Sequence, residues 1–331
     1  MNYKNDKLII DPYYLTGITD GEGNFYISIY EDKRRSNKPQ VRFFFKVSQR
    51  DHSVNMLYAL ANFLNCGSVT IENKNTKTMR FVVNNIEDIE KRVIPHFDKY
   101  PLISSKRLNY ESFKKAFIFF KNGEHLKPEG LSQIIAIKNS MNKGRPFEDK
   151  FYSVGLPKNI IIKPSWLQGL ADGEGSFGVY LNATNSIKEK NIIEISIKTD
   201  FNIGQNIHDI SILDAIKMFF GKGFIKPKLK DFSDINEIKS TCLNAANYIN
   251  NDPHSFLPFF KEYPLITQKQ LDLLDFIKFY ELKQSKAYLK LDGFKLMLEI
   301  AQGMNSGRFG KSKRNIIQIP EWNQQTKVII K

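Results

Sequence analysis

The sequence predicts an α+β fold in which one αββαββα unit occurs twice, as a pseudo-two-fold tandem repeat. The first observation is a repeated segment: residues 12–25 (PYYLTGITDGEGNF) and 164–177 (PSWLQGLADGEGSF) agree at 8 of 14 positions without a gap. The second is an alternation of apolar and polar residues after each copy, typical of half-buried strands. The third is a proline at the start of each copy, where helices often begin.

The repeat continues through the rest of the chain. Matching segments are FKVSQ at 45–49 and FNIGQ at 201–205, YPLISSK at 100–106 and YPLITQK at 263–269, and MNKGR at 141–145 and MNSGR at 304–308. The offset grows from 152 to 156 and then to 163, through insertions in polar stretches that resemble hairpin loops. We therefore expect an N-terminal half at 1–147, a linker at 148–163 and a C-terminal half at 164–331.

Each element of the unit has a local signal. Pro12 and Pro164 begin the repeated helix, which should end at the Gly-Glu-Gly, with Gly23 as its stop. From Val41 to Gln49 the apolar residues fall on one face of a strand. The matching strand places Ile193, Ile195, Ile197, Phe201 and Ile203 inside. We expect further elements as a helix at 51–65, a strand pair at 68–84 and helices at 86–98, 104–121 and 129–142.

The charge of the chain indicates a polyanionic partner. Lys and Arg total 49 against 35 Asp and Glu, a net charge of +14, with 27 against 17 before residue 164 and 22 against 18 after it. Nucleic acid is the leading candidate and an anionic membrane surface the second, although no basic amphipathic helix stands out. The two cysteines, expected as buried thiols, are too few for a disulfide framework or a four-ligand zinc site. No apolar run is long enough to span a bilayer.

Glycines four residues apart give each repeated helix one side without Cβ atoms. These residues are Gly17 and Gly21 in the first copy and Gly169 and Gly173 in the second. Because glycine allows close backbone approach, the two helices are expected to pack against each other across the pseudo-two-fold axis.

The acidic residue of each Gly-Glu-Gly would then lie at adjacent helix C-termini. Glu22 and Glu174 would repel each other and face the negative ends of two helix dipoles. A single exposed Glu after a helix has no special meaning, but its repetition in both copies favours a divalent-cation site. Asp20 and Asp172 lie on another helix face, and we interpret them as local hydrogen-bonding residues.

The doubled motif resembles a known family signature. LTGITDGEG at 15–23 and LQGLADGEG at 167–175 are similar to two copies of the LAGLIDADG signature of homing endonucleases, with Glu22 and Glu174 at its acidic eighth position. The similarity covers nearly the whole chain and is greatest to the monomeric, double-motif branch associated with fungal mitochondrial introns. It implies motif helices at the central interface, two antiparallel sheets that form a DNA-binding saddle, and a mitochondrial protein encoded in the organelle.

The saddle that the resemblance implies would be lined by the outer strand faces. They combine cations suited to phosphates with polar side chains suited to base edges. For each residue alone, a solvated strand face is an equally good interpretation. The predicted DNA-binding residues are Tyr26, Ser28, Tyr30, Arg42, Lys46, Ser48, Lys74, Lys77, Arg80, Tyr180, Asn182, Lys198, Asn202, Lys226, Lys228, Lys230 and Lys239.

The resemblance also assigns catalytic roles. Glu22 and Glu174 would bind Mg²⁺, at a site that Mn²⁺ or Ca²⁺ could also occupy. Gln49 and Gln205 match the position that organises the water shell, and Lys106 and Lys269 match the basic residues near the scissile phosphates. Ordinary strand-end amides and solvated helix starts are the alternatives for these four. We predict no histidine general base, because the five histidines do not recur in register.

The resulting hypothesis is a site-specific endonuclease for double-stranded DNA. It would cut a long, imperfectly palindromic site, leave short 3′ overhangs and initiate intron homing, as a monomer without a membrane partner. An RNA-binding maturase that helps its host intron to splice is the alternative, with intron RNA as partner. A DNA-binding regulator without cleavage is a third. Neither alternative requires the paired acids, glutamines and lysines, whose presence in both copies favours catalysis.

Overall fold

The fold is seen in a computed structural model of the chain. It describes residues 8–31, 39–146, 160–187, 191–227, 245–309, 320, 322 and 326–330. Of the predicted linker, only residues 160–163 belong to this part.

The first half is a four-stranded antiparallel sheet covered by helices. Its strands have the order β1-β2-β4-β3. They are β1 (Gly23–Glu31), β2 (Pro39–Arg50), β3 (Ser68–Asn73) and β4 (Thr78–Val83), and the helices are α1 (Pro12–Glu22), α2 (Val54–Leu64), α3 (Ile86–Asp88), α4 (Ile94–Lys99), α5 (Lys106–Lys121) and α6 (Pro128–Asn139). A π-helical turn, η2 (Ile89–Val93), joins α3 to α4.

The second half repeats this plan and adds one strand. Its sheet has the order β5-β6-β8-β7, and β9 pairs in parallel with β6. The strands are β5 (Gly175–Asn185), β6 (Ile192–Asn206), β7 (Phe224–Pro227), β8 (Ala245–Asn250) and β9 (Lys327–Ile330), and the helices are α8 (Pro164–Glu174), α9 (Ile210–Phe220), α10 (Pro253–Glu262), α11 (Lys269–Gln284) and α12 (Leu291–Gly303). β9 was not predicted from the sequence.

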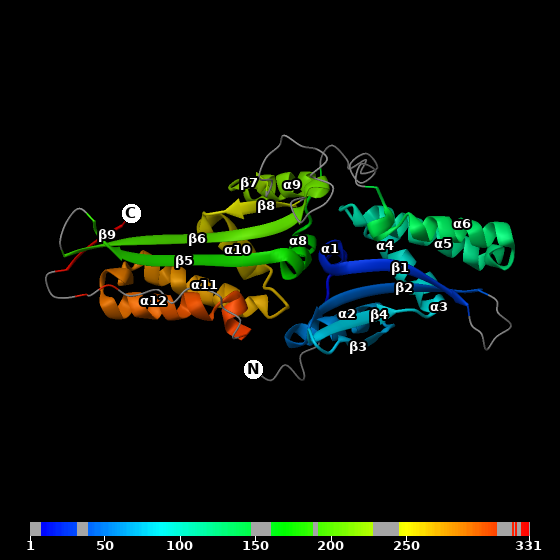
Figure 1. Cartoon of the computed structure of the whole chain (residues 1–331), viewed down its shortest axis with the longest axis horizontal. Coiled ribbons are helices and arrows are strands. Elements are labelled where there is room, and N and C mark those ends of the chain that lie inside the picture. The colour runs from blue at the N-terminus through cyan, green and yellow to red at the C-terminus, as the bar shows by residue number, and fades with distance from the viewer. Residues whose placement is uncertain are drawn as a thin grey trace.

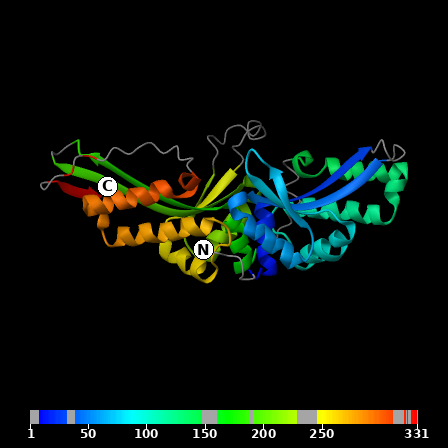
Figure 2. The same cartoon turned by 90° about the horizontal axis from the view of Figure 1, so that it is seen from below.

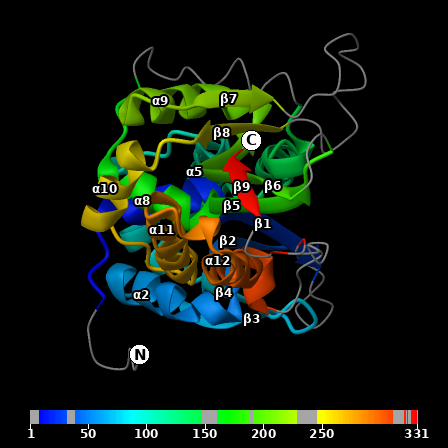
Figure 3. The same ribbon diagram turned by 90° about the vertical axis from the view of Figure 1, so that its left-hand side faces the viewer.

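The halves lie end to end, with α1 and α8 side by side at the centre (Figure 1). The long helices gather on one side of both sheets and leave the other side as a broad curved face (Figure 2). Viewed along the long axis, β9 lies at the end of the second sheet, close to β5 and β6 (Figure 3). Each half has its own apolar core, in which aromatic side chains such as Phe43 and Phe201 are fully buried.

The predicted αββαββα order and the strand phases are confirmed. Ile193, Ile195, Phe201 and Ile203 are buried, and Ile197 is half-buried on the same face. The expected end of α1 is also confirmed: the helix ends at Glu22 with Gly23 as its C-cap, and Gly23 has an extended φ of −75° because it already starts β1. Glycine fits there for lack of room, since a Cβ would lie 2.7 Å from the carbonyl oxygen of Thr19.

Candidate active site and nucleic-acid interface

The centre of the molecule is built by the crossing of α1 and α8. A Cβ on Gly17 would lie 1.9 Å from the carbonyl oxygen of Trp166, and a Cβ on Gly169 would lie 2.3 Å from that of Tyr14. No real side chain tolerates such distances, so glycine is required for this approach. The predicted packing of the two motif helices is therefore confirmed.

The two motif glutamates lie across this crossing from each other. A Cβ on Gly21 would be 3.3 Å from Glu174 Cγ, and a Cβ on Gly173 would be 3.3 Å from Glu22 Cγ. Burial raises the pKa of Glu22, the charge of Glu174 raises it further, and two lysines oppose the rise. Such a pair of hard oxygen donors, held together despite their repulsion, suits a divalent cation.

Two lysines supply positive charge to the same centre. Lys106 begins α5, and its Nζ donates to the carbonyl oxygens of Thr19 (3.2 Å) and Gly21 at the end of α1. Lys269 begins α11 and donates to Ala171 O (3.3 Å) and Gly173 O at the end of α8. Burial lowers the pKa of both ammonium groups, and the nearby carboxylates oppose that shift.

The motif aspartates are hydrogen-bonding residues, as expected, but the expectation of local partners was wrong, because their bonds connect the two halves. Asp20 accepts hydrogen bonds from the backbone N–H groups of Ile103 and Ser104 (both 3.1 Å) and from the indole of Trp166 (2.8 Å) in the other half. Burial raises the pKa of Asp20, and these donors oppose the rise.

Asp172 has the equivalent environment. It accepts from the backbone N–H groups of Ile266 (2.9 Å) and Thr267 (3.0 Å) and from the hydroxyl of Tyr14 (2.8 Å). Tyr14 and Trp166 are equivalent in the repeat, so each half donates one hydrogen bond to the aspartate of the other. These bonds hold the chain segments that lead into Lys106 and Lys269.

The two glutamines occupy equivalent strand ends. Gln49 lies two residues beyond Val47, which pairs with Gly23, and Gln205 lies two residues beyond Ile203, which pairs with Gly175. Both glutamines therefore extend past the first residue of the neighbouring strand, toward the end of a motif helix. Both are half-buried.

The first sheet places most predicted DNA-facing residues on one face. Tyr26, Ser28 and Tyr30 pair with Phe44, Arg42 and Gln40, opposite to the phase of the buried side chains, and Lys46, Ser48 and Arg80 share this face. Rings and cations pack along it: Tyr26 stacks on Phe44 at 4.6 Å, and Arg42 lies 4.9 Å from the Tyr30 ring. Lys46 forms an ion pair with Glu72, which the sequence pattern did not indicate.

Lys74 and Lys77 lie at the tip of the β3–β4 hairpin rather than on the strand face. Both are exposed, and Lys77 has a positive φ of 51°. They therefore extend the basic face beyond the edge of the first sheet.

The second sheet repeats the pattern with a longer surface. Tyr180 pairs with Lys198, and Asn182, Asn202 and Lys226 share their face. Lys228, Lys230 and Lys239 lie outside the described residues.

β9 adds positions to this face that sequence reasoning missed. Its parallel register pairs Lys327 with Ile192 and Ile329 with Glu194, in phase with the saddle-facing side chains of β6. The intervening Val328 packs against the core. No repeat signal could have indicated this strand, because it has no matching segment in the first half's sequence.

One statement about the histidines was wrong. The offset of 156 residues that relates the ends of β2 and β6, the inner strands of the two sheets, also relates His52 to His208. Both lie in short 3-10 turns that follow these strands, η1 (Asp51–Ser53) and η5 (Ile207–Asp209). The ring of His52 stacks on Phe309 at 4.3 Å, and His208 Nε2 lies 2.8 Å from Ser105 Oγ.

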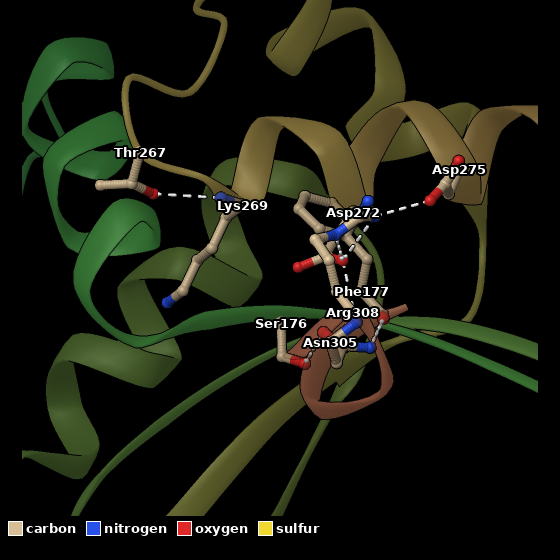
Figure 4. Close-up of polar contacts among 8 residues, drawn as sticks. All are labelled: Ser176, Phe177, Thr267, Lys269, Asp272, Asp275, Asn305 and Arg308. Carbon is tan, nitrogen blue, oxygen red and sulfur yellow. Dashed lines mark hydrogen bonds and ion pairs between the residues drawn. The ribbon is translucent and has the colours of Figure 1, made fainter. Parts of the chain in front are cut away.

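The closing MN-x-GR segments tie each sheet to a long helix. In the second half, Arg308 donates to Asp272 (2.9 Å) and Asp275 (2.6 Å), and Asn305 donates to the carbonyl oxygen of Phe177 (2.9 Å). Figure 4 shows this cluster beneath α11, with the ammonium of Lys269 pointing away from it. These contacts fix the first turns of α11, whose first residue is Lys269.

Other site types lack support in the described part of the chain. It contains no group of three or more His, Cys, Asp and Glu side chains placed to hold a metal ion. Cys66 is half-buried, with its pKa raised to about 11 by burial, and Cys242 lies outside the described residues. Among the helices of this same part, none is both long enough and apolar enough to cross a bilayer.

Comparison with known proteins agrees with this geometry. The family model for LAGLIDADG endonucleases matches residues 15–117 and 167–280, which together are about two thirds of the chain. The two matches begin at the two motif helices and end in α5 and α11. The chain belongs to the LAGLIDADG endonuclease family.

Similar curated proteins come from fungi. The chain is 29% identical over 299 residues to a probable intron-encoded endonuclease 3 of Neurospora crassa, covering 87% of this chain and 53% of that protein. It is 30% identical over 249 residues to a probable intron-encoded endonuclease Cox1-I1b of Schizosaccharomyces pombe, covering 72% and 59%. The chain thus spans little more than half the length of these relatives.

Solved structures match over nearly their full length. One is I-SmaMI bound to uncleaved DNA target in the presence of calcium ions, with a TM-score of 0.74 and 26% identity over 89% of this chain and 99% of that one. Another is the LAGLIDADG homing endonuclease I-LtrWI bound to target DNA, with a TM-score of 0.74 and 26% identity over 89% and 98%.

Proposed function

We propose that this protein is a site-specific endonuclease that cuts both strands of a long, imperfectly palindromic DNA duplex. The observation that carries the proposal is the position of Glu22 and Glu174. They meet where the two sheets meet, so a duplex lying along both sheets would present its two backbones to one pair of carboxylates. The length of the saddle, two sheets end to end, suits a long site.

The carboxylates fit a divalent metal, for which Mg²⁺ is our proposal. Two carboxylates cannot fill the coordination shell of such an ion, so phosphate oxygens and water would complete it. When bound, such ions supply an activated water and neutralise charge on the leaving oxygen. The structure of I-SmaMI bound to uncleaved DNA target was obtained in the presence of calcium ions, which supports a divalent site in this family.

The protein residues orient and balance this centre. Glu22 and Glu174 would supply the negative charge that attracts the cation, and Lys106 and Lys269, which lie near both glutamates, would stabilise charge that develops on the phosphates. Gln49 and Gln205, at the strand ends, would donate and accept hydrogen bonds to metal-bound water. The proton that the attacking water loses would pass to water connected to bulk solvent.

We further propose that the protein acts as a monomer, leaves short 3′ overhangs and initiates intron homing in mitochondria. The presence of both motifs in one chain supports the monomer, and the intron-encoded fungal relatives support the setting. A maturase role would need none of the paired acids, glutamines and lysines that both halves retain.

Selection from a randomised duplex library tests the proposal. Purified protein with Mg²⁺ should enrich one cleaved site with cuts in both strands, and EDTA should abolish cleavage but not binding. Enrichment of bound but uncut DNA with Mg²⁺ present would contradict the proposal and favour a regulator. Tight binding of the host intron RNA without DNA cleavage would instead favour the maturase.

A further inference from the structure

The 3-10 turn after each inner strand contacts the start of a long helix in the other half. η5 of the second half lies against Ser105, the residue before Lys106, and η1 of the first half lies against Gln268, the residue before Lys269. The turns thus cross the pseudo-two-fold axis in both directions. They reach the residues adjacent to the two lysines of the centre.

The two crossings use different chemistry. Asp209 accepts from Ser105 N at 2.7 Å and from Ser105 Oγ at 2.9 Å, and His208 lies 2.8 Å from the same hydroxyl. In the opposite direction, Ser53 Oγ accepts a single hydrogen bond from Gln268 N at 3.2 Å. Asp209 and His208 are 3% and 8% exposed, so water competes little for these bonds.

This contact bears directly on the position of Lys106. A carboxylate that accepts from the residue before a helix fixes the first turn of that helix, as a capping residue does. Lys106 stands in this first turn, and its Nζ reaches the last carbonyls of α1 beside Glu22. Burial lowers the pKa of Lys106, and Asp209 is among the carboxylates that oppose the shift, which agrees with their closeness.

We propose that Asp209 and Ser53 are reciprocal positioning residues, through which each half sets the lysine of the other half. Asp209 positions Lys106 through two charge-assisted bonds to the preceding residue Ser105, and Ser53 positions Lys269 through one neutral bond to the preceding residue Gln268. Because the scissile phosphates belong to opposite strands, each lysine serves the phosphate nearer to it. We call the Asp209–Ser105 and Ser53–Gln268 contacts the two clamps. Loss of one clamp therefore slows cleavage of one DNA strand more than that of the other. This inference rests on the proposed nuclease function.

The test compares Asp209→Ala, Asp209→Ser and Ser53→Ala with the wild-type protein. Asp214→Ala removes an equal charge from an exposed position of α9 and serves as the matched control. Cleavage is followed at saturating protein in a single turnover, with the two DNA strands labelled separately. DNA affinity and Tm are measured for each variant.

Asp209→Ala should slow one strand about 10-fold more than the other and accumulate nicked DNA, since small misplacements of a catalytic group cost ~10–100-fold. Asp209→Ser, which copies the acceptor of the first half, should restore most of the lost rate. Ser53→Ala should slow the opposite strand, by a smaller factor. Equal slowing of both strands with an unchanged Tm would overturn the proposal.

Hydrogen exchange gives a second readout that does not depend on cleavage. In the DNA-free protein, Asp209→Ala should increase deuterium uptake in residues 103–108 of the first half but not in 266–271. Ser53→Ala should do the reverse. If the wild-type protein cuts no DNA while these shifts occur, the nuclease proposal fails and the clamp stands. If cleavage occurs and uptake changes only within the mutated half, the clamp fails.

Discussion

The two halves agree at the centre and differ at the edges. Both supply a glutamate, a lysine and a glutamine to equivalent positions, and both donate one hydrogen bond to the aspartate of the other half. Away from the centre, the second half has longer inner strands, an added strand β9 and an ion-paired closing segment. The catalytic centre that we propose would constrain both halves equally, whereas each sheet would be free to fit its own part of the DNA.

The most severe test of equivalence removes one acid at a time. Glu22→Gln and Glu174→Gln should each reduce double-strand cleavage by at least ~10³-fold, because a metal site with one charged ligand loses most of its affinity for the cation. DNA affinity should stay within about twofold. Strand-resolved cleavage assays measure both variants, and full activity in either one would show that the halves do not share a centre.

The helix crossing should tolerate no added atom in either half. Gly17→Ala and Gly169→Ala should each lower the free energy of unfolding by about 3 kcal/mol or more, because the new Cβ would meet backbone of the other helix. Gly21→Ala, with 3.3 Å to a flexible side chain, should cost much less. Urea denaturation would measure all three, and equal effects at Gly17 and Gly21 would argue against the observed crossing.

Substitution of the arginine in the two closing MN-x-GR segments should lower the stability of the protein by unequal amounts. In the first half, Arg145 donates to the neutral oxygens of Leu108 and Ser112, whereas Arg308 neutralises the buried Asp272. Arg308→Ala should therefore cost about 3 kcal/mol of stability and Arg145→Ala about 1 kcal/mol. Thermal unfolding checks the order, and Asp272→Asn in the Arg308→Ala background should recover part of the loss.

Removal of β9 should affect one side of the DNA site alone. A chain that ends at residue 325 loses Lys327 and Ile329 from the second sheet. Its DNA affinity should fall about 10-fold, with relaxed specificity at the outer base pairs of one half-site. Library selection with the full and shortened chains measures this change, and relaxation in both half-sites would contradict the placement of β9.

The smallest effect concerns stability without metal. The pKa of Glu22 is raised in the folded protein, so its ionised form opposes folding. The protonated form therefore adds stability at low pH, and this contribution is lost as pH rises through the raised pKa. In EDTA, Glu22→Gln should therefore raise Tm at pH 7 by roughly 2 °C, the shift that ~1 kcal/mol produces in domains of this size. Near pH 4 the difference should disappear, and divalent cation should reverse the order at pH 7.

Sequence reasoning succeeded where a pattern was local and repeated. The helix at Pro12, the alternating strand before Gln49 and the doubled Gly-Glu-Gly could all be found because periodicity and repetition identify them. It failed for contacts that join dissimilar residues. Asp209 and Ser105 correspond to Ser53 and Gln268 in the repeat, so no shared pattern indicated their hydrogen bonds.

The other misses have different causes. The equivalence of His52 and His208 follows from the same offset of 156 residues that relates 45–49 to 201–205, so the sequence did indicate it. β9 depends on long-range pairing with β6, which four residues of sequence cannot specify. Lys46 has the pattern of a free cation, yet the neighbouring strand brings Glu72 beside it.

The two halves of the protein should share one metal-dependent centre. A crystal structure of the wild-type protein with its selected DNA and Mn²⁺, with the ions located by anomalous scattering, would show this centre. We expect Mn²⁺ between Glu22 and Glu174, in contact with phosphate oxygens of both strands. Mn²⁺ bound by only one of these residues, or at a site away from both, would contradict the shared centre.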